Sequence, residues 1–354
     1  MHNLLLYDRL DVSAAGYRGN ITHLARDWRR STRALGGYWT GDFTLTQDDV
    51  TRAEMVDFYH QAIGWRVSEQ SYGFTTWEGE ITQLRMTLDG VTWMRSMDTA
   101  RWHNRVKILW GGGETAWGED TDSTALYGDS EYIEQAPSMY NQTAAEARRD
   151  RLLAQNAYPR SRAQGGLVID PTQEPGEDGL SVVCAGYVFS MNRRYRETDT
   201  APTNASAQIS TLVGESEFVT AGNIATNTLQ VPISTGGTPT PLWDLIEEIV
   251  VMGDTSGDDW DGGVYAGREF NLAAAPTTAS HYWRDGNLYD AGGNPVLPTH
   301  VKPGILVEIV GAPRGRLLPG GAMWDRPNRV YIEELEFQAP DKLRLIPRVP
   351  RTVI

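Results

Sequence analysis

The sequence predicts a β-rich α+β protein of two β-barrel or β-sandwich domains with a few packed helices. Strand patterns outnumber helical ones along the 354 residues, and the helical stretches carry recognisable end signals. A chain of this length also exceeds what one hydrophobic core usually fills. No stretch of about 20 to 50 residues repeats, which disfavours solenoids and propellers.

Residues 1–110 predict the first β domain, with one helix. Thr51-x-x-Glu54 forms a capping box ahead of apolar residues at helical spacing, so a helix is expected over 51–63. Apolar and polar residues then alternate up to Asp89-Gly90, and the alternation resumes after it. This pattern is typical of a hairpin with a two-residue turn. The apolar run over 105–110 predicts a further strand.

Residues 111–165 predict a helical connecting segment. A glycine-rich acidic loop opens it, and Thr143-x-x-Glu146 predicts the cap of a helix over 144–157, closed by Pro159. The following stretch, 161–179, is rich in Gly, Pro and acidic residues. We therefore place a domain boundary near residue 165.

Residues 166–354 predict the second β domain. Strand patterns cover 180–197, followed by a polar stretch over 198–207. Thr240 as cap and Pro241 at the first helical position predict a helix over 241–252. Alternating runs at 304–310, 330–337 and 342–347 predict the last strands.

A short internal similarity links the two predicted domains. The segment 77–84 aligns with 184–191, apolar for apolar, and Gly79 aligns with Gly186. A glycine inside a strand often marks a bulge or a close backbone approach. The match hints at two similarly built β units.

Composition limits the classes of function. No apolar run approaches the length of a membrane helix, so we expect a soluble chain without membrane insertion. The start has no secretory pattern, which predicts cytoplasmic synthesis. The single cysteine, Cys184, lies in an apolar run and is interpreted as a buried structural thiol. The net charge of −14 argues against a protein that grips nucleic acid.

The basic residues are mostly arginine, because only Lys107, Lys302 and Lys342 are lysines among 32. Arginine with tryptophan and tyrosine is typical of interface cores, and the sequence holds 12 Trp and 15 Tyr. A GC-rich genome is the alternative explanation for the arginine excess. Exposed tryptophans that stack on sugar rings are an alternative to core packing and subunit contact.

The usual catalytic and nucleotide-binding motifs are missing, and six scattered histidines have no metal-site spacing. We therefore expect a non-enzyme with no catalytic residues, no cofactor and no metal. Asp254 and Asp258 are weak candidates for calcium ligands. A carboxylate pair of the glycosidase type stays open as an alternative, and one place for it is the acidic loop of Glu114, Glu119, Asp120 and Asp122.

Three segments, taken together, resemble the tail-hub (baseplate-hub, tail-tip) structural proteins of long-tailed bacteriophages. The first, 77–98, has W-x-G and a hairpin ending in Arg and Ser. The second, 122–160, has S-x-x-x-Y-G-x-x-E before an alanine-rich helix followed by Y-P-R, and the third, 180–197, has C-x-G-Y and R-Y. The matching residues are Trp77, Gly79, Arg95, Ser96, Ser123, Tyr127, Gly128, Glu131, Cys184, Gly186, Tyr187, Arg194 and Tyr195. The resemblance covers about residues 75–200 and is looser beyond.

The resemblance implies a virion structural protein of the tail tip, made in the host cytoplasm. Its domains would be two tail-tube-like β units, and three copies would form a ring between the tail tube and distal tip proteins. Genome DNA would pass through the lumen without specific binding. A hexameric ring of the distal-tail type and a carbohydrate-binding host-attachment module are the alternatives.

Overall fold

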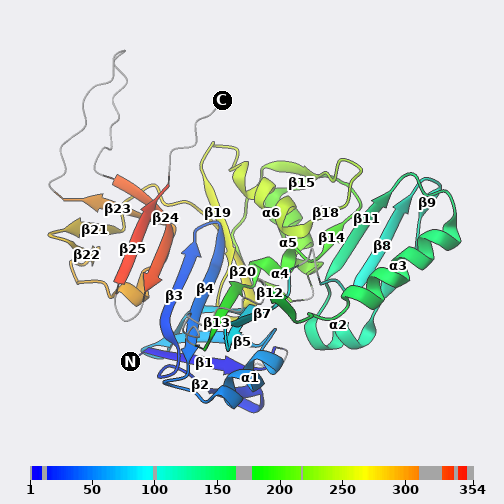
Figure 1. The fold of residues 1–354 in the computed structure, drawn as a ribbon. Coiled ribbons are helices and arrows are strands. Elements are labelled where there is room, and N and C mark those ends of the chain that lie inside the picture. The colour runs from blue at the N-terminus through cyan, green and yellow to red at the C-terminus, as the bar shows by residue number, and fades with distance from the viewer. Residues whose placement is uncertain are drawn as a thin grey trace, which may run out of the picture.

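The computed structural model describes residues 2–9, 14–98, 102–164, 178–216, 218–310, 329–338 and 342–348. Its hydrophobic residues gather in four clusters. Figure 1 shows the first sheet with α1 at the lower centre, α5 and α6 above it, β21–β25 at one end and α2 and α3 at the other. Within the described residues, no helix is long and apolar enough to cross a membrane.

The first cluster fills a strongly curved sheet. The elements are β1 (His2–Tyr7), β2 (Tyr17–Asn20), β3 (Arg26–Arg33), β4 (Gly36–Thr46), α1 (Arg52–Gln61), β5 (Arg66–Ser71), β6 (Phe74–Leu88), β7 (Val91–Ser96), β12 (Arg162–Gln164) and β13 (Gly179–Gly186). Neighbouring strands pair in the order β2-β1-β5-β6-β13-β4-β3, all antiparallel. Among the described strands no pairing joins β2 to β3, so the predicted closed barrel is not established.

Local signals produce the predicted elements of this sheet. Thr51 and Glu54 form the reciprocal capping box, with Glu54 Oε2 accepting from the Thr51 amide at 2.8 Å. The strands β6 and β7 meet at Asp89-Gly90, where both residues have positive φ (50° and 78°), as a type I′ turn requires. Met55 and Tyr59 of α1 are buried in the cluster inside the sheet.

Strand β13 lies beyond the predicted boundary near residue 165 but belongs to the first sheet. It follows the connecting segment in sequence, yet it pairs with both β4 and β6 of the first predicted domain. Its apolar residues Leu180, Val182 and Cys184 belong to the first cluster, which explains the pairing. The division into 1–110, 111–165 and 166–354 stays a prediction, with β13 shared across it.

The connecting segment forms a second unit. It contains β9 (Gly113–Glu114), β10 (Gly118–Glu119), α2 (Thr121–Tyr127), β11 (Glu131–Ala136) and α3 (Gln142–Asn156). It also includes β8 (Arg105–Trp110), which was predicted as part of the first β domain but pairs with β11. Helix α3 packs on β8 through Ala145 and Leu152. Its cap differs from the prediction, because Asn141 Oδ1, rather than Thr143, accepts a hydrogen bond from the Ala144 amide.

The third cluster lies under α5 and α6. Its elements are α4 (Val188–Met191), β14 (Tyr195–Arg196), β15 (Thr200–Asn204), α5 (Ala205–Gly214), β16 (Thr220–Ile224), β17 (Gln230–Ile233), β18 (Thr240–Pro241), α6 (Leu242–Val251), β19 (Trp260–Val264) and β20 (Glu269–Ala274). Thr240 does not cap α6, because it pairs with Arg196 in a short ladder. Helix α5 was not predicted, although Ala205, Ile209 and Val213 recur at helical spacing and are buried.

The last unit contains β21 (His281–Arg284), β22 (Asn287–Asp290), β23 (Ile305–Ile309), β24 (Arg329–Gln338) and β25 (Lys342–Pro347). Three short 3₁₀ turns complete the described elements: Ala14–Gly16, Ala266–Arg268 and Pro298–His300. Strand β24 pairs with β3, so hydrogen bonds continue from the first sheet into this unit. The three predicted strands here are confirmed within one residue at each end.

Candidate functional site

The two glycines of the internal similarity lie opposite each other in one ladder. Gly79 of β6 pairs with Gly186 of β13. A Cβ at Gly186 would lie 1.7 Å from the carbonyl oxygen of Tyr38, and one at Gly79 would lie 2.3 Å from that of Ala185. Close backbone approach therefore requires both glycines.

The internal similarity does not reflect equivalent strands. Residues 77–84 are strand throughout, whereas the aligned 184–191 leave the sheet after Gly186 and form α4. Tyr187, Val188 and Met191 are buried in the cluster under α6, which draws the chain away from the sheet. The hint of two similarly built units from this match is wrong.

A buried ionic group, the Glu80 triad of Arg9, Glu80 and Arg193, lies beside this glycine pair. Arg9 Nε is 3.3 Å from Glu80 Oε2, and an Arg193 nitrogen is 2.5 Å from Glu80 Oε1. All three side chains are less than one-tenth exposed. Burial raises the pKa of Glu80, but the charges and hydrogen bonds of both arginines outweigh it and the pKa is lowered.

The Glu80 triad connects the first sheet to the second unit. The Arg193 guanidinium lies over the Trp102 ring at 5.3 Å, and its carbonyl accepts from the Glu131 amide at 2.8 Å. On the other side, a Cβ at Gly128 would meet the Arg9 guanidinium at 2.6 Å. Gly128 therefore ends α2, with φ 72°, where a side chain has no room.

A second ionic group adjoins the triad. Arg105 reaches Asp129 at 2.7 Å and Glu131 at 2.8 Å, and Arg194 also pairs with Asp129. The Tyr195 amide donates to Glu131 Oε2 at 2.8 Å. Segments around residues 105, 130 and 194, far apart in sequence, are therefore held together by charge-assisted bonds.

The aromatic residues of the resemblance are packing groups. Trp77 is fully buried and donates from Nε1 to the Ser31 carbonyl at 3.2 Å. The Tyr127 hydroxyl accepts from Arg95 at 3.3 Å, and its ring meets Trp102 edge-on. Tyr187 is fully buried against Phe218.

The first candidate calcium ligand, Asp254, accepts hydrogen bonds from its own loop. Asp254 Oδ1 accepts from the amides of Ser256 (2.8 Å) and Asp258 (3.0 Å), and Oδ2 accepts from Trp260 Nε1 (3.1 Å). The Trp260 bond, with those backbone bonds, lowers the pKa of Asp254. Within the described ranges, no group of three or more His, Cys, Asp or Glu side chains is placed to hold a metal.

Carboxylates at the candidate glycosidase positions are tied into structure. In the acidic loop, Glu119 is 3.8 Å from Arg105, Glu114 is 3.6 Å from Lys107, and Asp120 caps α2 by accepting from the Ser123 amide. A cavity of about 740 Å³ over β3, β4, β24 and β25 also holds three carboxylates. Each of these pairs with an arginine: Arg29–Asp42 at 3.0 Å, Arg33–Glu334 at 3.2 Å and Arg344–Glu336 at 3.1 Å.

The tryptophans are mostly interior. Trp28, Trp77 and Trp102 are fully buried, and among the tryptophans that the structure describes only Trp93 and Trp283 are exposed by more than a third. The tryptophans of the described residues form no exposed row for sugar stacking. Cys184 is also fully buried, and burial raises the pKa of its thiol, as expected for a structural cysteine.

Of the comparisons with known proteins, only the one with solved structures found similar chains. No protein-family model matches the chain, and no curated protein sequence matches it. Among solved structures, the similar chains include two tail proteins. One is the tail protein from Neisseria meningitidis MC58, with 8% identity, TM-score 0.45, and 98% of this chain and 96% of that chain covered. Another is the 43 kDa tail protein of prophage MuSo2 from Shewanella oneidensis, with 8% identity, TM-score 0.37, and 98% and 97% covered. Likeness at these scores does not by itself establish a shared fold.

Proposed function

We propose that this chain is a structural protein of a bacteriophage tail, and that its place is the hub of the tail tip. In this role three copies form a ring that joins the tail tube to distal tip proteins and surrounds the DNA channel. The function is assembly, without turnover of a substrate. A hexameric ring of the distal-tail type is the alternative arrangement.

One observation supports the proposal most directly. Many residues that carry the sequence resemblance converge on one junction, although the chain separates them widely. Gly79 faces Gly186 next to the Glu80 triad, Gly128 adjoins Arg9 of that triad, and Glu131 binds the Arg194–Tyr195 segment. The residues of the resemblance therefore hold the first sheet and the second unit together, which a ring component under mechanical stress needs.

The charge of the chain is consistent with a DNA channel. A formal charge of −14 disfavours adhesion of the phosphate backbone, because strong binding to DNA depends on clustered cations that release counterions. An acidic lumen would let a genome pass without being held. Closed rings need one heterologous interface repeated around an axis.

The purified full chain, imaged alone and together with tail-tube protein, tests the proposal. We expect particles with the mass of three 39.3 kDa chains and images with three-fold symmetry. Six chains with six-fold symmetry would favour the distal-tail type. A monomer that stays single beside tube protein, or hydrolysis of a polysaccharide that one Asp-to-Asn or Glu-to-Gln change abolishes, would contradict the hub.

Complementation then tests the junction. In a phage that encodes this chain, Gly79→Ala should give few complete tails, because the added Cβ disturbs the β6–β13 pairing at the junction. The matched control is Gly214→Ala, where an added Cβ meets no atom within 4 Å. Equal numbers of complete tails from both variants would argue against a role for the junction in assembly.

A further inference from the structure

A second cavity, of about 530 Å³, lies between the tip of the β5–β6 hairpin and residues 299–303. This volume is within the range of about 300–1,000 Å³ that small-molecule sites occupy. Rings of Tyr38, Phe74, Tyr265 and His300 line it. None of the ionic groups described above lies in its wall, so the cavity is separate from the junction.

The hairpin tip holds two aromatic rings out into solvent. Tyr72 is 63% exposed and Phe74 is 67% exposed, and both rings meet His300 edge-on, at 5.8 and 6.2 Å between centroids. The turn that presents them has positive φ at Tyr72 (51°) and Gly73 (86°). Large rings this exposed, gathered at the mouth of a cavity, indicate a surface for a ligand with an apolar face.

One wall of the cavity holds a polar group without a partner. Thr32 is 3% exposed, and within the described structure its Oγ1 has no hydrogen-bond partner. The Oγ1 atom is itself covered, so Thr32 closes this wall and does not meet a ligand. Further hydroxyls line the same cavity, from Thr75, Thr76 and Thr299. A ligand hydroxyl suits this wall, because it can both donate and accept.

The charged lining is basic in a strongly acidic protein. Lys302 lines the cavity beside the His300 ring, and among the described residues no carboxylate side chain lines it, although the chain carries a net charge of −14. A bound anion would therefore meet a local cation without a competing acid. With no carboxylate in the wall, the cavity also lacks the acid and base that glycoside hydrolysis uses.

We propose that this cavity binds an acidic saccharide, a sugar ring that carries a carboxylate. The C–H face of the ring packs on Phe74, its hydroxyls meet the wall of Thr75, Thr76 and Thr299, and its carboxylate faces Lys302. The site goes beyond the structural role proposed above and is independent of it. A ring can assemble whether or not this cavity is filled.

Saturation-transfer NMR and titration calorimetry on the full chain test the proposal, with a galacturonic acid trisaccharide as probe and the neutral galactose trisaccharide for comparison. We expect the acidic probe to bind more tightly. Phe74→Ala should weaken its binding about tenfold, through loss of the stacking face. Thr75→Val keeps the shape and should weaken it about threefold. Lys302→Gln should remove the preference for the acidic probe.

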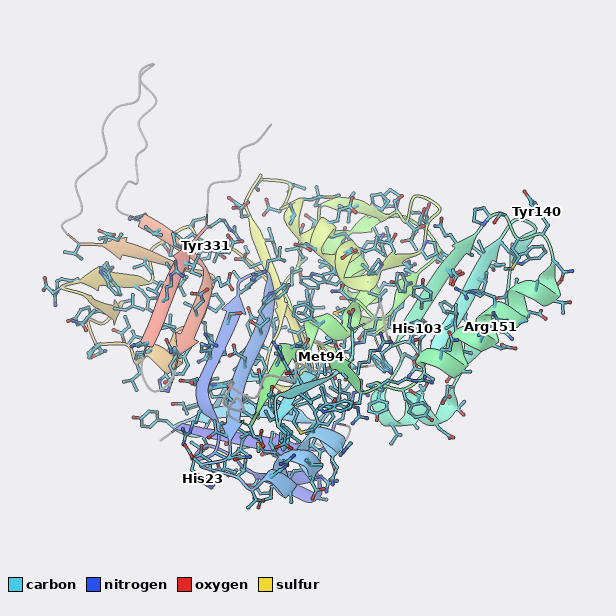
Figure 2. All side chains as sticks on the ribbon, in the orientation of Figure 1. His23, Met94, His103, Tyr140, Arg151 and Tyr331 are labelled. Carbon is cyan, nitrogen blue, oxygen red and sulfur yellow. The ribbon has the colours of Figure 1, made fainter. Side chains whose placement is uncertain are left out.

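Tyr140→Ala is the matched control, because Tyr140 is 78% exposed and lies at the far end of the second unit (Figure 2). It should leave binding unchanged. Absence of binding for both probes, or binding that Phe74→Ala leaves intact, would overturn the site. Equal affinity for the two probes would overturn the acidic assignment. Binding of an aromatic peptide in place of either sugar would assign the cavity to a protein partner and overturn the proposal.

Discussion

Replacing Glu80 by Gln should destabilise the junction far more than an ordinary ion-pair change. The variant keeps the shape of the side chain but leaves two buried guanidinium groups, those of Arg9 and Arg193, facing an amide. Removing one partner of a buried ion pair typically costs about 3–5 kcal/mol. Whole domains are stable by about 5–15 kcal/mol, so the loss is a large share.

Hydrogen–deuterium exchange with peptide resolution is the assay, because a chain with several cores need not unfold in one step. Peptides from β6, β13 and the segment around Trp102 should exchange faster in Glu80→Gln. Glu336→Gln is the control, since Glu336 makes the same type of pair at the surface and exposed pairs contribute about 0–1 kcal/mol. Equal effects of the two variants would refute the reasoning.

The Glu80 prediction has a defined pH dependence. The pKa of Glu80 in the folded chain is lowered from its ordinary 4.5, so the stability it contributes is complete above that value. It is lost as the pH falls through the folded-state pKa. The difference in exchange between the native chain and Glu80→Gln should therefore be constant at neutral pH and shrink in acid. A difference that grows as the pH falls would contradict the assigned direction.

The other predictions concern single sites. Gly186→Ala should lower the local stability around β13 by about 3 kcal/mol or more, because its Cβ overlaps a carbonyl of β4. Gly214→Ala should be neutral or slightly stabilising, and peptide-resolved hydrogen–deuterium exchange compares the two variants. Asn141→Ala should cost about 1 kcal/mol as the loss of a helix cap, and Thr143→Ala should cost much less. The Asp254 oxygens accept three hydrogen bonds from their own loop, so Asp254→Asn should speed amide exchange there. Because those oxygens are already engaged, added calcium should leave the melting temperature of the native chain unchanged.

Local features of this fold were predictable because their signals lie within a few residues of each other. The capping box at Thr51, the turn at Asp89-Gly90 and the three C-terminal strands follow from spacing alone. Helix α5 was equally predictable. Its polar start drew the interpretation toward a loop, although Ile209 and Val213 continue the helical spacing.

Long-range features were not predictable from one sequence. Nothing local indicates that β13 pairs with strands some hundred residues earlier, or that Arg9, Glu80 and Arg193 meet. Charged residues are normally read as a solvated surface, so the Glu80 triad has no signature in composition. Gly79 and Gly186 were singled out correctly as sites of close approach, but their pairing with each other required the structure.

Part of the arginine excess is used in ion pairs within the chain. Some arginines contact two carboxylates at once, as the half-buried Arg105 does with Asp129 and Glu131, and the buried Arg348 with Asp259 and Asp261. A planar guanidinium can serve two acceptors in fixed directions. The buried ammonium of Lys107 also contacts two carboxylates, those of Glu114 and Glu197. These arginines therefore cannot also be the anchors of a ring interface. If copies of this chain meet around an axis, their contacts must use groups that the fold leaves outside, such as the exposed Trp93 and Tyr140, and those are the positions where substitution should weaken assembly without weakening the fold.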